Sequence, residues 1–171
     1  NQAYITAEEY ADMISKKTGA LIACSLQTGG LCAGAAPRAV NNLYNAGISL
    51  GIAFQIQDDY LDIYGDPNVF GKATGTDIAN NKKTWLLTYA LRQAAGEDLV
   101  RLNGLLTNRE DPERVAKIIG IYNKLGVREA AQEQVALYMG KTIAALEGLE
   151  ARPERTGLLI EYIQSLLNRV R

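Results

Sequence analysis

Residues 54–87, FQIQDDYLDIYGDPNVFGKATGTDIANNKKTWLL, carry most of the information about how this chain folds. Three aspartates, Asp58, Asp59 and Asp62, lie within five residues of an otherwise apolar helical pattern. Counted from Gln55, they fall at offsets of three, four and seven residues, so all four side chains share one narrow face of a helix. The other faces carry apolar side chains. The pattern therefore predicts a mostly buried helix with one acidic stripe.

The composition narrows the chemistry that the chain can perform. The 171 residues are 47% apolar and 22% charged, with a net charge of −1, values typical of a globular protein with one sizeable core. The near-neutral charge argues against nucleic-acid binding. The sequence contains no His, which excludes His-based acid–base catalysis and the usual zinc sites. Catalysis would have to use Asp, Glu, Lys, Tyr, Thr or a metal held by oxygen.

Cysteine placement and apolar run length predict a cytoplasmic chain. Cys24 and Cys32 would lie about 12 Å apart along one helix, too far for a disulfide. We therefore expect both to be reduced core residues. The sequence shows no signal or transit peptide. Its longest apolar stretch, residues 20–36, is shorter than the roughly 20 residues that a membrane span needs and is interrupted by polar residues.

Helical periodicity runs through nearly the whole sequence, which predicts an all-α fold with a single domain over residues 1–171. Residues 6–9, TAEE, have the pattern of a capping box that starts the first helix. Residues 16–19, KKTG, interrupt the periodicity before a second helical run to about residue 36. The remaining expectations are a helix over 37–64, a glycine-rich loop to about 77, a helix over about 81–94, a helix that starts at Asp111-Pro112-Glu113 and ends at Gly126, an amphipathic helix after it, and a last helix after Pro153.

An acidic stripe on a buried helix needs a compensating cation. Carboxylates one turn apart repel, and burial raises the cost unless they are paired or bind a cation. Oxygen ligands favour Mg²⁺ or Ca²⁺, but the spacing does not match a calcium loop. Mg²⁺ is typically shared with substrate phosphates, whose free oxygens the lysines downstream could bind, namely Lys72, Lys82 and Lys83. The alternative is an acidic solvated face with partners elsewhere. A P-loop is excluded by spacing.

Two segments together resemble a known family. Residues 51–66, GIAFQIQDDYLDIYGD, and 71–84, GKATGTDIANNKKT, resemble the second aspartate-rich region of the trans-isoprenyl diphosphate synthases, the farnesyl and geranylgeranyl diphosphate synthase family. The family pattern is F-Q-x-x-D-D-x-x-D, then G-K-x-x-G-x-D, then four residues, Lys, any residue and Thr. Residues 16–30, KKTGALIACSLQTGG, resemble the upstream Lys-Thr helix break of the same family. The resemblance implies an isoprenoid synthase-type helical bundle.

The resemblance also implies a reaction. In this family an allylic diphosphate loses its diphosphate with the help of Mg²⁺, and the double bond of isopentenyl diphosphate attacks the resulting allylic cation. A proton is then lost, which the departing diphosphate can accept. The residues of the motifs are most similar to those of short-chain, farnesyl-type members, so the resemblance implies a geranyl, farnesyl or geranylgeranyl product. The absence of His fits this chemistry, because the protein need not supply a strong base.

Carried over residue by residue, the resemblance implies a role for each motif position. Asp58 would be the main Mg²⁺ ligand, with Asp59 and Asp62 supporting it. Asp77 would orient metal-bound water or Lys82, with helix capping as its alternative. The catalytic group would be Lys17, Thr18, Gln55 and Asp58. The groups that bind substrate would be Lys17, Lys72 and Lys82 on the allylic diphosphate, Thr18 and Gln55 facing the developing cation, Phe54 beside isopentenyl diphosphate, and the terminal Arg169 and Arg171. A core Phe and a solvated helix end are the alternatives for Phe54 and for the two arginines.

One expected feature of the family is missing. The family has two aspartate-rich motifs on facing helices and is about twice this length, whereas only 16 residues precede Lys17. We therefore expect this chain to correspond to the C-terminal half of a longer, homodimeric synthase. Three alternatives stay open: a non-catalytic helical partner of a full synthase, a relative that performs head-to-head condensation or terpene cyclisation, and a plain helical bundle. Product length cannot be assigned from these residues.

The missing motif leads to a first prediction. We expect the 171 residues alone to be inactive, because the ligands for further Mg²⁺ ions and most of the isopentenyl diphosphate site would lie on the other motif. The measurement is turnover of the purified chain with an allylic diphosphate, isopentenyl diphosphate and Mg²⁺. Product formed at an enzymatic rate would contradict the prediction.

Overall fold

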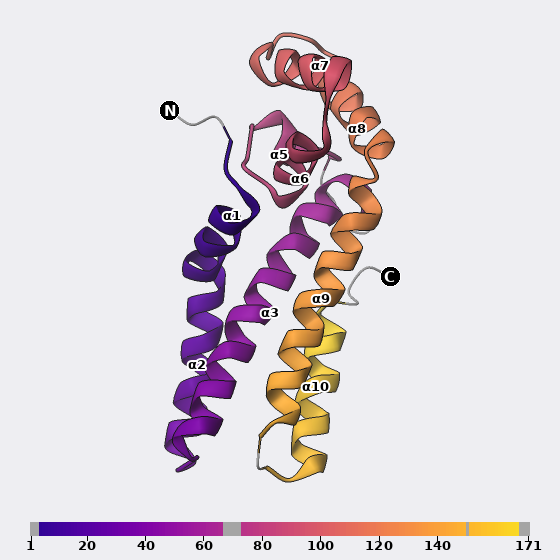
Figure 1. Cartoon of the computed structure of the whole chain (residues 1–171). Coiled ribbons are helices and arrows are strands. Elements are labelled where there is room, and N and C mark those ends of the chain that lie inside the picture. The colour runs from indigo at the N-terminus through magenta and orange to yellow at the C-terminus, as the bar shows by residue number, and fades with distance from the viewer. Residues whose placement is uncertain (1–3, 67–72, 150, 168–171) are drawn as a thin grey trace. The chain divides into compact units, whose positions relative to one another are not determined.

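The computed structural model describes residues 4–66, 73–149 and 151–167, and this part of the chain is helical with no strand (Figure 1). The all-α prediction is confirmed. None of the described helices is both long and apolar enough to cross a bilayer. In chain order the helices are α1 (Ala7–Ile14), a π-helical segment (Ser15–Gly19), α2 (Ala20–Cys32), α3 (Pro37–Tyr64), α5 (Thr76–Ala79), α6 (Trp85–Gln93), α7 (Gly96–Thr107), α8 (Arg114–Lys124), α9 (Val127–Glu147) and α10 (Pro153–Leu167).

Several predicted helix boundaries are confirmed. The capping box before α1 is formed: the Glu9 N–H donates to Thr6 Oγ1 at 3.1 Å, and the Thr6 N–H donates to Glu9 Oε2 at 2.8 Å. Helix α3 has the predicted bounds, with Pro37 as its first residue. Gly126 ends α8 in the left-handed conformation, with φ of 67°, which glycine adopts without steric cost.

The predicted interruption at residues 16–19 is a change of hydrogen bonding rather than a break. The Ala20 N–H donates to the carbonyl of Ser15, five residues back, so the chain stays helical through a π-turn. A π-turn inserts one extra residue and rotates the side chains that follow it, and such segments are frequent at functional sites. Lys17 and Thr18 both lie in this segment.

Other expectations were wrong. Helix α6 begins at Trp85 rather than near residue 81, because Asn81 is left-handed and the extended Thr84 caps the helix, its side chain accepting the Leu87 N–H. Helix α8 begins at Arg114, and the Asp111 side chain accepts a hydrogen bond from the Glu113 N–H in the turn before it. The expected loop, by contrast, does end close to residue 77, because α5 begins at Thr76. The expected core cysteines, Cys24 and Cys32, are free but exposed.

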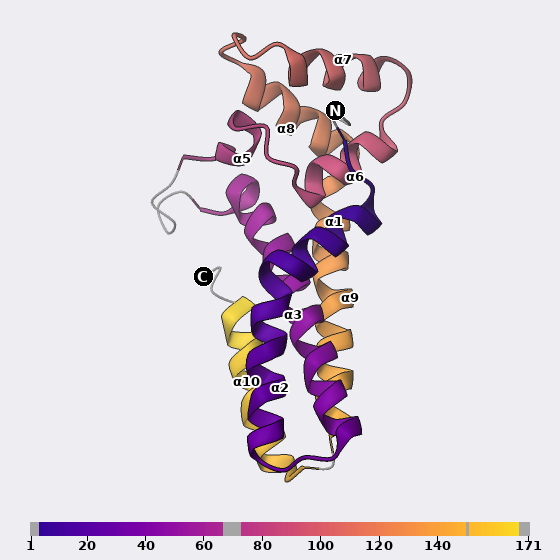
Figure 2. The same ribbon diagram turned by 90° about the vertical axis from the view of Figure 1, so that its left-hand side faces the viewer.

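The chain divides into two compact units, one formed by Asn1–Tyr10 and Ile56–Glu133, the other by Ala11–Gln55 and Gln134–Arg171. Helices α1, α3 and α9 contribute residues to both units. In the first unit, α5 to α8 follow the last turns of α3, and α8 leads into α9 (Figure 1). In the second unit, α10 runs back along α9 (Figure 1), and in the view of Figure 2 it lies behind α2. The single-domain assignment stays a prediction.

Apolar packing in the second unit joins three helices. Ala46 and Leu50 from α3, Leu146 from α9 and Ile163 from α10 form one buried cluster.

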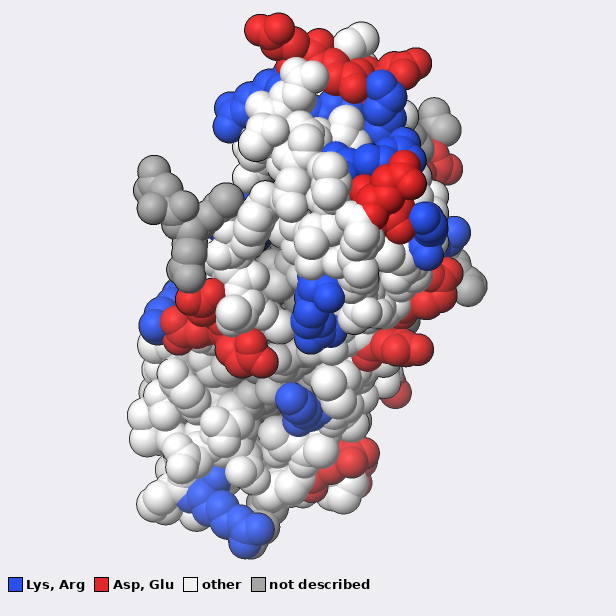
Figure 3. Space-filling model, turned by 45° about the horizontal axis from the view of Figure 1, so that its top comes forward, with Lys and Arg blue, Asp and Glu red and all other residues white. Residues whose placement is uncertain are grey.

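The surface is mixed in charge: on the face drawn in Figure 3, Lys and Arg side chains lie in small groups between Asp and Glu side chains. This face therefore offers no continuous basic area to a polyanion.

Close approach of two backbones explains the small residues of α3. A Cβ added at Gly51 would lie 2.4 Å from the Cα of Gly19, and one added at Gly47 would lie 2.3 Å from the Cα of Ala23. Both contacts are with backbone atoms, which cannot move aside as the end of a flexible side chain can. Glycine is therefore required at these two positions for α3 to pack against the π-segment and α2.

This packing leads to a second prediction. Gly51→Ala should lower the free energy of unfolding by about 2 kcal/mol or more, because the added methyl group forces two backbones apart. Gly29→Ala is the matched control, since a Cβ there meets nothing within 4 Å and should raise stability by up to about 1 kcal/mol through helix propensity. Urea unfolding of both variants measures the difference. Equal stability of the two variants would contradict the assigned packing.

Candidate active site

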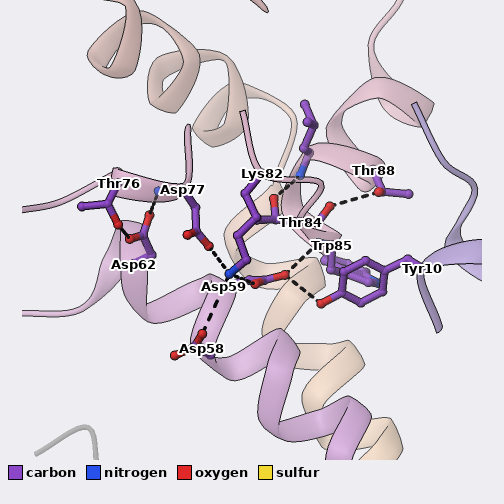
Figure 4. Close-up of polar contacts among 11 residues, drawn as sticks. Tyr10, Asp58, Asp59, Asp62, Thr76, Asp77, Lys82, Thr84, Trp85 and Thr88 are labelled. Carbon is purple, nitrogen blue, oxygen red and sulfur yellow. Dashed lines mark hydrogen bonds and ion pairs between the residues drawn. The ribbon is translucent and has the colours of Figure 1, made fainter. Parts of the chain in front are cut away.

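The three aspartates of α3 have different environments, although they share one stripe (Figure 4). The Asp58 side chain is 63% exposed, whereas that of Asp59 is only 1% exposed. Asp62 is part-buried against the start of α5. The helical spacing thus places them together, but only Asp58 presents its carboxylate largely to solvent.

Asp59 is a buried carboxylate held by three donors from other segments. The Tyr10 hydroxyl donates to Asp59 Oδ2 at 2.7 Å, and the Trp85 N–H donates to the same oxygen at 3.0 Å. The Lys82 ammonium lies 3.3 Å from Asp59 Oδ1. Burial and the adjacent Asp59 charge raise the pKa of Tyr10, so Tyr10 is a neutral phenol that donates its proton. Asp59 is therefore satisfied by protein groups.

Asp62 joins α3 to the segment that carries the lysines. The Thr76 hydroxyl donates to Asp62 Oδ1, and the Asp77 N–H donates to Asp62 Oδ2 at 2.9 Å. The Gly75 N–H also donates to the Asp62 main-chain carbonyl at 2.7 Å. Because the first residues of a helix have N–H groups without helical partners, a carboxylate is a natural acceptor there. Asp62 thus fixes the start of α5 and the direction of the Asp77 side chain.

Lys82 is the cation of the site. Its Nζ lies 2.7 Å from Asp77 Oδ2, 3.3 Å from Asp59 Oδ1 and 4.0 Å from Asp58 Oδ2, and its side chain is 35% exposed. Burial lowers the pKa of Lys82, but the hydrogen bond to Asp77 and the Asp59 charge outweigh it, so the pKa is raised overall. Burial also raises the pKa of Asp77, against the opposing effect of Lys82. Lys82 is therefore a protonated ammonium at neutral pH.

Four of the remaining candidate residues belong to the second unit, namely Lys17, Thr18, Phe54 and Gln55. Phe54 is 43% exposed, so the alternative of a core Phe is wrong. The Asp77 side chain does not cap α5, whose first residue follows Gly75, and instead accepts a hydrogen bond from Lys82. Three predicted substrate-binding residues lie outside the described residues, namely Lys72, Arg169 and Arg171.

Tyr10 and Trp85 are site residues that sequence reasoning did not identify, and Thr84 has a role that it did not predict. Tyr10 is 49 residues from its partner Asp59, and no local pattern links the two. Thr84 caps α6 and so aims the Trp85 N–H, a main-chain group, at Asp59. The Thr of the family pattern indicated position 84 but not its role.

The carboxylates of the site fit a Mg²⁺ ion that would be bound by one or two of them and otherwise by substrate phosphates and water. In the part of the chain that the structure describes, no three His, Cys, Asp or Glu side chains are arranged to hold a metal by themselves. Mg²⁺ in phosphate-transfer and related sites is often bound by one or two carboxylates plus substrate phosphates and water. Asp58 is an exposed carboxylate suited to that role, and Asp62 stands one turn further along α3.

Comparison with known proteins identifies the family. A family model described as polyprenyl synthetase matches residues 1–123. The chain belongs to the polyprenyl synthetase family. It is 38% identical over 154 residues to a short chain isoprenyl diphosphate synthase of Methanothermobacter thermautotrophicus, covering 90% of this chain and 47% of that protein. It is 33% identical over 163 residues to a geranylfarnesyl diphosphate synthase of Aeropyrum pernix, covering 93% of this chain and 50% of that protein.

Solved structures give the same picture of this polyprenyl synthetase family member. A geranylgeranyl pyrophosphate synthase crystal structure matches with a TM-score of 0.88 at 30% identity, over 98% of this chain and 53% of that one. The geranylgeranyl pyrophosphate synthetase of Pyrococcus horikoshii matches with a TM-score of 0.82 at 33% identity, over 95% and 50%. The helices thus follow the isoprenoid synthase fold. The chain spans about half the length of the curated relatives it matches.

The buried ion pair leads to a third prediction. Asp59→Asn should lower the free energy of unfolding by about 2 kcal/mol, because the amide removes the charge opposite Lys82 and turns a donor toward groups that are themselves donors. The value is below that of a fully buried pair because Lys82 is partly exposed. Asp12→Asn removes an exposed ion pair with Lys16 and should change stability little. Similar urea midpoints for the two variants would contradict the assignment.

Proposed function

We propose that these residues belong to a Mg²⁺-dependent prenyltransferase of isoprenoid biosynthesis, which condenses an allylic diphosphate with isopentenyl diphosphate and releases diphosphate. The observation that carries the proposal is the exposed Asp58 carboxylate beside the Lys82 ammonium, which Asp59 and Asp77 hold in place. A carboxylate for a metal and an ammonium for phosphate oxygens are the two groups that a metal–diphosphate requires. A short-chain product agrees with the names of several relatives.

Asp58 would hold Mg²⁺, with Asp59 and Asp62 in support, as the family resemblance implies. When bound, the ion neutralises negative charge on the diphosphate and so makes it a better leaving group. The chain's own contribution is to donate hydrogen bonds to the diphosphate oxygens from the ammonium groups of Lys82, Lys72 and Lys17. These charge-assisted hydrogen bonds strengthen as the leaving group gains charge.

The bonds and protons of this reaction balance without a strong base from the protein. The allylic C–O bond breaks with its electron pair on the departing diphosphate, and the double bond of isopentenyl diphosphate forms the new C–C bond. The proton lost in restoring a double bond passes to diphosphate. Thr18 and Gln55 would direct oxygen dipoles at the allylic cation, and Phe54, exposed on α3, would lie beside isopentenyl diphosphate. The catalytic effect is one of positioning and charge stabilisation.

The substrates, location and oligomeric state of this enzyme are part of the same proposal. The substrates are an allylic diphosphate and isopentenyl diphosphate, and nucleic acid is not a partner. We further propose a cytoplasmic location and a homodimer, as the family resemblance implies. Arg171 would contribute to binding isopentenyl diphosphate.

Calorimetric titration tests the metal and diphosphate roles, which is the fourth prediction. Inorganic diphosphate and geranyl diphosphate should each bind the chain at least about tenfold more tightly with Mg²⁺ than with EDTA, because carboxylates surround Lys82 and repel a free anion. Asp58→Asn should weaken Mg²⁺-dependent binding about tenfold through loss of a ligand. Asp98→Asn, which removes an ion pair with Lys124 on the same unit, is the matched control and should bind like the unmodified chain.

Two results would count against the proposal. The first is a diphosphate affinity that does not depend on Mg²⁺. The second is unchanged binding by the Asp58→Asn variant. The reaction itself is tested by incorporation of labelled isopentenyl diphosphate in the full-length protein that carries these residues, where Asp58→Asn should lower kcat/KM by about 100-fold or more.

A further inference from the structure

Arg114 is a buried cation whose hydrogen bonds go mostly to main-chain carbonyls. It is the first residue of α8 and only 4% exposed. Its Nε donates to the carbonyl of Leu105 at 2.6 Å, and its Nη1 donates to the carbonyl of Ile78 at 3.0 Å and to that of Ala79 at 3.5 Å. Its Nη2 donates to the Asn81 side-chain oxygen. Buried arginines are more often paired with carboxylates, whereas this side chain binds α7 through Nε and the end of α5 and the turn after it through Nη1 and Nη2.

Asn81 is the residue of that turn with an unusual backbone. Its φ of 53° is left-handed, and no other non-glycine residue in the described part has a positive φ. This conformation is sterically unfavourable for most residues, although Asn tolerates it better than others. The contact with Arg114 and the hydrogen bond from the Asn81 N–H to the Ile78 carbonyl, 3.1 Å, stabilise it. Arg114 therefore holds the turn at its left-handed residue.

Lys82 follows Asn81 directly, so its direction depends on that turn. The Lys82 N–H donates to the Asp77 carbonyl at 2.9 Å, while Lys82 Nζ contacts the Asp77 side chain. A change of φ at Asn81 would rotate the backbone that follows and move Lys82 away from Asp59. A flexible lysine loses rotamer freedom when it is fixed on a ligand, and fixing it beforehand improves affinity.

We propose that Arg114 and Asn81 are positioning residues that place the Lys82 ammonium for the bound diphosphate. The inference rests on the proposed role of Lys82 in diphosphate binding. Neither residue would contact the substrate. Arg114 acts through the main chain and through Asn81, and Asn81 acts through the backbone of Lys82.

Asn81 offers sharper variants than the buried Arg114, whose removal would also destabilise the fold. Asn81→Gly allows the left-handed φ at no steric cost but removes the amide that Arg114 binds. Asn81→Asp keeps an oxygen acceptor for Arg114 and tolerates the same φ, so it is the conservative variant. Asn80→Gly is the matched control, because Asn80 is exposed, lies one residue earlier in the same turn and has an ordinary φ of −86°.

The fifth prediction concerns diphosphate affinity. Calorimetry measures how tightly each variant of the full 171-residue chain binds inorganic diphosphate in the presence of Mg²⁺, well below the unfolding temperature of the variant. Lys82→Ala should weaken binding about tenfold, through loss of one charge-assisted contact, and Asn81→Gly about fivefold, through loss of preorganisation. Asn81→Asp and Asn80→Gly should stay within about twofold of the unmodified chain. In the Lys82→Ala background, Asn81→Gly should have no further effect, because the group that it positions is gone.

The outcomes separate this inference from the function on which it rests. If the unmodified chain does not bind Mg²⁺-diphosphate, the proposed function fails, and the inference with it. If Lys82→Ala weakens binding but Asn81→Gly does not, only the positioning role is overturned. An equal loss from Asn81→Gly with and without Lys82 would show a merely structural effect and would also overturn it.

Discussion

The buried carboxylate of Asp59 is the constraint on which the rest of the site depends. A carboxylate that is 1% exposed destabilises the fold unless a cation and hydrogen-bond donors satisfy it. Lys82, the Tyr10 hydroxyl and the Trp85 N–H do so. They come from the first helix, from the turn after α5 and from the start of α6. Satisfying one charge therefore fixes three segments of the first unit around the end of α3.

The same constraint divides the work among the three aspartates of α3. Helical spacing puts them on one stripe, but the side chains differ in burial and contact different segments. Each aspartate therefore has a separate role. Asp59 anchors Lys82 from inside, and Asp62 holds the start of α5 through Thr76 and Asp77. Asp58 is left largely exposed. The proposed metal ligand is thus supported by two carboxylates that are already engaged with protein groups.

Local sequence patterns predicted the features that depend on neighbouring residues. They failed where contacts between residues far apart in the sequence determine the structure. The bounds of α3 and the capping box follow from Pro37 and from Thr6 and Glu9, which act within a few residues. The start of α6 was misplaced because a left-handed Asn81 held by Arg114, 33 residues away, ends the preceding turn. Tyr10 could not be assigned, since helical periodicity marks it as apolar core and gives no sign of Asp59. Likewise, Cys24 and Cys32 were expected to be core residues, yet both are exposed.

Charge balance around Lys82 explains why an anion should need a metal to bind here. Asp58, Asp59 and Asp77 all lie within 4.0 Å of one ammonium, so the group has two negative charges in excess. At separations of a few ångströms in a partly buried site, like charges repel by several kcal/mol. Diphosphate would therefore be repelled despite Lys82, whereas one divalent cation cancels the excess. Burial is the main cause of the raised pKa of Asp77, and the charges of Asp62 and Asp58 add to it. In the structure Lys82 balances carboxylates of the site, and under the proposed function it would also donate to diphosphate once a metal had removed the repulsion.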